Sequence, residues 1–176
     1  MRNRRFTVIL MCLLLLQTWS CDDSYSVFSN RYHVFYRCDA SQPPFNAACS
    51  MGVFISVRQS GQNLVVTDMD GHESRYPMSE VDARSFHFGL AGIVIGTPAL
   101  DNPDCAVYAF DLGCPVCDRS SKRIVLNSTG VAECPDCHTT FDLNNNGFVL
   151  ASERSDARPL YRYPVSRSGS QIVVSN

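Results

Sequence analysis

The chain has 176 residues, a formal net charge of −2, 45% hydrophobic residues and 18% charged residues. This length suits one domain with a buried core. The near-neutral charge excludes the strongly basic surface by which proteins bind nucleic acid, so no nucleic-acid partner is expected. Nine cysteines are many for this length, and outside the cytoplasm such thiols usually become disulfides or metal ligands.

The first residues have the pattern of a secretory signal. Residues 1–5 are basic, and an almost wholly apolar run follows over residues 6–16. The run is too short to span a bilayer, and its place behind a basic start favours an export signal over a buried helix. We therefore expect residues 1–20 to be a signal peptide.

Cys21 lies where a bacterial lipoprotein signal places its lipidated cysteine. Ser20 fits the position before it and residues 22–23 form a hydrophilic exit, whereas Thr18 and Trp19 depart from the usual pattern. We expect lipidation of Cys21, and hence a lipoprotein of the bacterial cell envelope that is anchored to a membrane and faces an extracytoplasmic space. Simple secretion is the alternative.

Short strands dominate the rest of the chain. No window shows helical periodicity over more than two turns, apart from one expected helical turn near 79–84. We expect a tether with a first strand over residues 21–50 and an all-β domain over 51–176, a small antiparallel sandwich or barrel. The expected strands are 31–37, 53–57, 64–67, 72–76, 92–96, 108–111, 123–126, 131–133, 148–150 and 171–174.

Two early cysteines bracket a proline-containing loop. Cys38 and Cys49 lie on either side of residues 41–44, Ser-Gln-Pro-Pro. A disulfide between them would close this loop, and two separately buried thiols are the alternative.

Four later cysteines form the strongest motif of the sequence. Cys114 and Cys117 enclose Pro-Val, and Cys134 and Cys137 enclose Pro-Asp, with 16 residues between the two pairs. This spacing is typical of a tetrahedral sulfur site for zinc or iron, and each proline stiffens its turn. Disulfides are an alternative in an oxidising compartment. Reactive redox thiols are a third, although they would call for a βαβ context that the sequence lacks.

Four segments carry a resemblance to a known family. They are 93–96 (Ile-Val-Ile-Gly), 107–115 (Val-Tyr-Ala-Phe-Asp-Leu-Gly-Cys-Pro), 134–143 (Cys-Pro-Asp-Cys-His-Thr-Thr-Phe-Asp-Leu) and 157–165 (Ala-Arg-Pro-Leu-Tyr-Arg-Tyr-Pro-Val). Over residues 92–174 the chain resembles the Rieske iron-sulfur domain. The resemblance implies a Rieske-like sandwich whose two cysteine loops meet at one end. It also implies a 2Fe-2S cluster, electron transfer and a redox protein partner.

The chain departs from the family at the ligands. The family uses two cysteines and two histidines, but the first loop here has no histidine, and Cys137 stands where the second loop has one. The four cysteines therefore permit a single zinc or iron ion as well as an all-cysteine 2Fe-2S cluster. His138 replaces a glycine of the family, and it is either a donor to a neighbouring thiolate or a plain exposed loop residue.

These observations leave two functions open. The first is a redox or electron-transfer module on a membrane-tethered lipoprotein. The second is a non-enzymatic structural or binding lipoprotein, whose four cysteines hold a structural zinc ion or form disulfides. The sequence has no nucleophile elbow, P-loop or zinc-protease helix, so we expect no catalytic residues.

Overall fold

The computed structural model of the chain describes residues 27–99 and 104–176. The expected signal peptide, residues 1–20, and Cys21 lie outside the described residues. The regular secondary structure of the described chain is almost entirely β, in three sheets, and all pairs of named strands are antiparallel. This confirms the all-β prediction. A short helix, α2 (Glu80–Ser85), and a 3₁₀ turn, η1 (Phe45–Cys49), accompany the strands.

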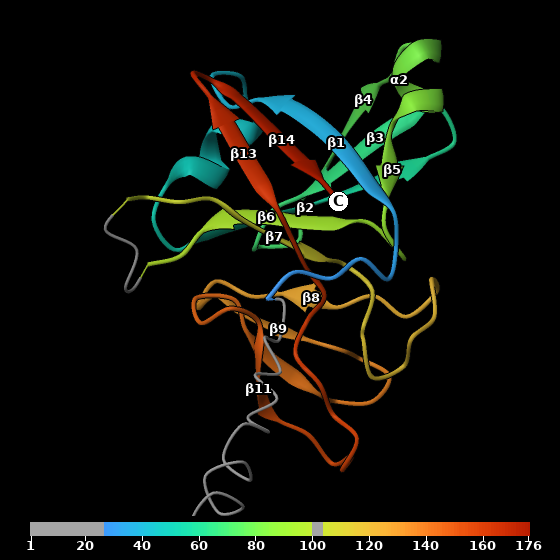
Figure 1. The fold of residues 1–176 in the computed structure, drawn as a ribbon, viewed down its shortest axis with the longest axis vertical. Helices are drawn as coiled ribbons and strands as arrows, with labels where there is room; N and C mark the ends of the chain where they lie inside the picture. Colours follow the sequence, from blue (N-terminus) through green and yellow to red (C-terminus); the bar gives the residue numbers. More distant parts are fainter. Residues whose placement is uncertain (1–26, 100–103) are drawn as a thin grey trace, which may run out of the picture.

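The three sheets are stacked as layers, and the largest lies in the middle (Figure 1). The middle sheet has six strands. In sheet order they are β12 (Arg162–Tyr163), β7 (Tyr108–Asp111), β6 (Ile93–Thr97), β2 (Val53–Ser60), β3 (Asn63–Thr67) and β4 (Glu73–Pro77).

Side chains of the middle sheet alternate between two hydrophobic cores. Successive side chains of a strand point to opposite faces, and β6 shows the result: Ile93 and Ile95 belong to one core and Val94 to the other. Strand β6 is buried along its whole length. The sequence therefore shows a continuous apolar run here, as expected for a strand covered on both faces.

One outer layer joins the two ends of the described chain. Its strands are β13 (Val165–Ser168), β14 (Gln171–Ser175), β1 (Val34–Asp39) and β5 (His87–Phe88), in that order. Because β1 pairs with β14 from Phe35 opposite Ser175 to Asp39 opposite Gln171, the N-terminal strand shares a sheet with the C-terminal strand. The expected domain boundary at residue 51 stays a prediction.

The other outer layer carries the cysteine loops. It contains β11 (Phe148–Ala151), β10 (Thr140–Asp142), β9 (Val131–Glu133) and β8 (Val125–Leu126). Figure 1 shows this layer at the end of the molecule opposite β1, β13 and β14. Its hydrophobic core includes Phe141 and Leu143, which pack with Phe110 from the middle sheet. In the part of the chain that the structure describes, no helix has the length and apolar character needed to cross a membrane.

Candidate metal centre

The four cysteines of the two Cys-Pro-X-Cys motifs meet at one point. We call residues 114–118, which follow β7, the first cysteine loop, and residues 134–138, between β9 and β10, the second cysteine loop. The Sγ atoms of Cys114 and Cys137 are 3.7 Å apart, and those of Cys117 and Cys134 are 3.8 Å apart. All four sulfur atoms lie within 4.8 Å of one another. The fold thus brings together the thiols that the sequence predicted as one site.

The two loops share one backbone conformation. In the first loop the N–H of Asp118 donates to the carbonyl of Cys114 at 2.8 Å, and in the second the N–H of His138 donates to the carbonyl of Cys134 at 2.8 Å. Asp118 and His138 both have positive φ, 52° and 54°. The left-handed residue closes each turn, so that both sulfurs of a loop point to the same side.

Two of the sulfur separations, 3.7 and 3.8 Å, match the edge of a tetrahedron around a single ion. A metal–sulfur bond of about 2.3 Å places the corners of a tetrahedron about 3.8 Å apart. A disulfide would instead bring two sulfur atoms to about 2.05 Å, and the seven cysteines in the described residues are all free. The arrangement therefore suits four thiolate ligands converging on one cation.

Burial divides the four thiols into an inner and an outer pair. Cys114 and Cys134 are wholly buried in the core beneath the loops, whereas Cys117 and Cys137 are half-buried. Burial raises the pKa of Cys114 to about 12 and also raises the pKa of Cys117. Burial opposes ionisation of Cys137 too, but hydrogen bonds with Thr139 and neighbouring thiols lower its pKa to about 7. Because the ligands must be thiolates, metal binding should release protons.

A buried carboxylate holds the start of the first loop. The N–H of Gly113 donates to Oδ1 of Asp111 at 2.6 Å, and the N–H of Leu90 donates to Oδ2 at 2.6 Å. A side chain at Gly89, whose φ is +66°, would collide with this carboxylate and with the Tyr163 hydroxyl. Sequence reasoning missed the role of Asp111; an acidic residue at the end of a buried strand was the available signal.

The residue after the first cysteine pair ties the loop to the N-terminal segment. Oδ1 of Asp118 accepts hydrogen bonds from the Tyr32 hydroxyl at 2.8 Å and the Tyr161 hydroxyl at 2.9 Å, and Oδ2 pairs with Arg31. Burial acts to raise the pKa of Asp118, but these hydrogen bonds and nearby cations outweigh it and lower the pKa. The Asp118 carboxylate therefore stays charged and holds the end of the first cysteine loop against Tyr32, Tyr161 and Arg31.

Ionic and polar contacts also link the two loops to their surroundings. Lys122, just after the first loop, forms an ion pair with Asp136 of the second loop. The guanidinium Nε of Arg158 donates to the carbonyl of Pro115 at 3.0 Å. Four thiolates would carry more negative charge than a divalent ion carries positive charge. The cationic groups of Lys122 and Arg158 lie beside this site.

His138 contributes to the second cysteine loop through its backbone N–H, which donates to the carbonyl of Cys134. Its side chain is exposed, and its Nδ1 lies 3.4 Å from Oε1 of Glu133. This position fits the expected exposed loop residue, and donation to a thiolate stays a prediction.

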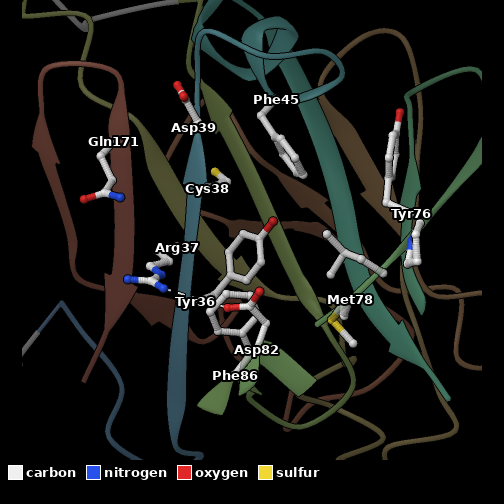
Figure 2. Close-up of a pocket in the computed structure, with 12 residues that line it drawn as sticks. Tyr36, Arg37, Cys38, Asp39, Phe45, Tyr76, Met78, Asp82, Phe86 and Gln171 are labelled. Atoms are coloured by element: carbon white, nitrogen blue, oxygen red, sulfur yellow. Dashed lines mark ion pairs between the residues drawn. The ribbon is translucent and has the colours of Figure 1, made fainter. Parts of the chain in front are cut away.

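Cys38 lies in a separate aromatic cleft. The cleft has a volume of about 470 Å³ and is lined by Tyr36, Phe45 and Phe86 among others. Figure 2 shows the Cys38 sulfur beside Tyr36 and below Asp39. Burial, with the nearby Cys49 thiol, raises the pKa of Cys38 to about 12. Both thiols are free in this structure, and their disulfide stays a prediction.

Comparisons with known proteins find structural neighbours only. No protein-family model matches the sequence, and no curated protein matches it. A chain from a complex of reduced oxygenase and oxidized ferredoxin in carbazole 1,9a-dioxygenase is 16% identical, with a TM-score of 0.39, and the match covers 81% of this chain and 93% of that chain. A Sphingomonas yanoikuyae B1 ferredoxin is 16% identical, with a TM-score of 0.33, over 67% of this chain and 88% of that chain.

A third neighbour is the ferredoxin of carbazole 1,9a-dioxygenase from Nocardioides aromaticivorans IC177. It is 17% identical, with a TM-score of 0.34, and the match covers 72% of this chain and 98% of that chain. All three TM-scores are below 0.5, so the function proposed for this chain rests on its own cysteine geometry.

Proposed function

We propose that this chain is an electron-transfer protein whose four cysteines hold one iron ion. The observation that carries the proposal is the set of four sulfur atoms within 4.8 Å, with separations of 3.7 and 3.8 Å between the loops. A tetrathiolate iron ion supplies one-electron redox chemistry. The protein residues fix its ligands, exclude water on the side of Cys114 and Cys134, and leave Cys117 and Cys137 near the surface, where a redox protein partner can approach.

The sulfur spacing favours a single ion over the 2Fe-2S cluster implied by the family resemblance. A two-iron cluster binds its ligand pairs to different irons, which separates the pairs by more than one tetrahedral edge. Here all four sulfur atoms lie within 4.8 Å of one another, and two separations between the loops, 3.7 and 3.8 Å, equal the edge of one tetrahedron. A single ion is also simpler to load after export, because an unfolded exported chain cannot easily carry a preassembled cluster.

A structural zinc site is the second candidate. Its support is the complete burial of Cys114 and Cys134 in the core that underlies the cysteine loops. A metal at this point would join the small β8–β11 sheet to the loop that follows β7. Structural zinc sites of four cysteines act in this way and add folding free energy directly.

Metal analysis of the full chain separates the candidates. We expect anaerobically purified protein to contain one iron per chain and to show an absorption spectrum that bleaches with dithionite. One zinc per chain and a colourless protein would support the structural candidate. Two irons with acid-labile sulfide would contradict the single-ion site, and protein without metal would contradict both candidates.

We also propose that the protein is tethered to a membrane of the bacterial cell envelope through lipid on Cys21. The support is the basic start, the short apolar run and the cysteine at the end of the signal pattern. Mass spectrometry of the N-terminal peptide from membrane extracts should find a lipidated Cys21, and Cys21→Ser should move the protein to the soluble fraction. An unmodified N-terminus in a soluble protein would contradict the anchor.

A further inference from the structure

An exposed apolar surface lies where the described chain begins. Four large apolar side chains there are substantially exposed: Val27 at 61%, Phe28 at 40%, Phe148 at 50% and Leu150 at 54%. We call these four residues the β11 patch. Exposed apolar groups collected in one place, rather than scattered singly, indicate a surface that contacts another apolar phase.

The patch surrounds a groove and is built by two distant parts of the chain. Val27, Phe28 and Phe148 line a cavity of about 470 Å³, together with Leu160 and other residues. On β11, Val149 packs against the core. Its neighbour Phe148 therefore points away from the core, because side chains alternate along a strand. Leu150 lies at a register shift in the pairing of β10 with β11 and is itself 54% exposed.

The patch is close in sequence to the expected lipid. Five residues, 22–26, separate Cys21 from Val27. A chain spans at most about 3.3–3.6 Å per residue, so the six steps from Cys21 to Val27 reach roughly 20 Å. A lipid on Cys21 would therefore hold the patch within about 20 Å of the membrane surface. A short tether also gives the patch a high effective concentration at that surface.

We propose that the β11 patch docks on the lipid bilayer beside the Cys21 anchor and thereby fixes the orientation of the domain. This inference rests on the proposed lipid anchor. Apolar side chains at a membrane interface insert into the boundary between headgroups and acyl chains. The guanidinium of Arg162 lines the same groove, 5.2 Å from the centre of the Phe28 ring, and is held in the protein by stacking on Tyr108 and a hydrogen bond to Asn146.

The orientation has a consequence for the metal centre. Strand β11 forms one edge of the sheet whose other edge is β8. Docking through the β11 patch would place one defined side of the domain on the bilayer. A redox protein partner would then meet a domain held in one orientation, rather than one that rotates freely on its tether.

A single tryptophan tests the contact directly. The chain has one tryptophan, Trp19, which lies in the expected signal peptide, so Phe148→Trp gives a lone reporter in the mature lipoprotein. Val81→Trp is the matched control, because Val81 is 70% exposed on α2, which lies at the end of the molecule opposite β11 (Figure 1). Leu150→Trp is a second patch variant in case the first fails to fold.

The lipidated proteins are reconstituted in vesicles of phosphatidylethanolamine and phosphatidylglycerol, with and without brominated acyl chains. We expect the patch tryptophans to emit at shorter wavelength and to be quenched roughly twofold or more by bromine, because they lie at the acyl boundary. The Val81→Trp side chain should show neither effect.

Each other outcome overturns the inference in a recognisable way. Protein that sediments with vesicles but whose patch tryptophans are not quenched retains its anchor and lacks the docking contact. A blue-shifted but unquenched tryptophan means that protein covers the patch, either residues 22–26 or a second copy. Equal quenching at Phe148→Trp and Val81→Trp means that the domain has no preferred orientation. Protein that does not sediment overturns the anchor as well.

Discussion

The hydroxyl of Tyr163 donates a hydrogen bond of 2.6 Å to Oδ2 of Asp111, and both side chains are wholly buried. The other oxygen of this carboxylate holds the N–H of Gly113, directly before Cys114. Burial raises the pKa of Asp111 and of Tyr163. The pair thus connects β12 and β7 to the first cysteine loop from beneath.

Tyr163→Phe removes this donor while keeping the ring. We expect a loss of about 1–3 kcal/mol in the free energy of unfolding, because a buried carboxylate is left with one donor fewer. Urea denaturation at constant metal content measures the loss. Tyr161→Phe is the control and should cost less, since Asp118 keeps its contacts with Tyr32 and Arg31. Equal losses in the two variants would contradict the larger contribution to stability assigned to the hydrogen bond from Tyr163 to Asp111.

Asp118→Asn tests the carboxylate that closes the first loop. The folded-state pKa of Asp118 is lowered, so its contribution to stability is present above its ordinary pKa and is lost as the pH falls through the folded value. We expect a cost of about 1 kcal/mol at pH 7, reduced by partial solvent exposure. The difference between wild type and variant, both with chelator, should shrink towards zero as the pH falls through the lowered folded-state pKa of Asp118. A difference that does not change with pH would contradict the assignment.

Cys117→Ser tests the outer ligand pair. Removing one of four thiolates should lower metal affinity by more than the roughly 10–100-fold that loss of a ligand's supporting partner costs. Competition with a chromophoric chelator measures the affinity. Cys105→Ser is the matched control, because Cys105 is an exposed free thiol outside the cluster. If both variants bind metal as the wild type does, the four-cysteine site is wrong.

His138→Gly tests the left-handed turn of the second loop. A non-glycine residue in this conformation costs about 1–2 kcal/mol, which exceeds the about 0.5–1 kcal/mol that glycine's extra backbone freedom costs. We expect a net gain of about 0.5–1 kcal/mol in stability, with metal content unchanged. A marked drop in metal affinity would instead support the imidazole as a donor to a thiolate.

Local patterns predicted much of this fold. Alternation and turn residues located the hairpin of β2 and β3, the buried strand β6, and the arms β8 and β9 within a few residues. The expected helical turn is α2, whose N-terminus is capped by Ser79. The sequence analysis did not identify η1, β5, β10, β12 or β13 as separate elements. Strands β5 and β12 have two residues each, too few to show a period.

The sequence analysis did not predict which distant segments of the chain pair in the fold. The pairing of β1 with β14 joins residues more than 130 positions apart, and nothing local to either strand specifies its partner. The four cysteines were identified because their spacing is itself a chemical requirement. Asp111 and Asp118 were not, since their roles depend on Tyr163 and Tyr32, which reach them only in the folded chain.

X-ray absorption at the metal edge of the purified full chain tests the central claim most directly. One ion held by Cys114, Cys117, Cys134 and Cys137 predicts a first shell of four sulfur atoms at about 2.3 Å and no second metal nearby. A neighbouring metal scatterer would show a cluster instead. A first shell with nitrogen or oxygen in place of sulfur would show that the four thiols do not converge on the ion.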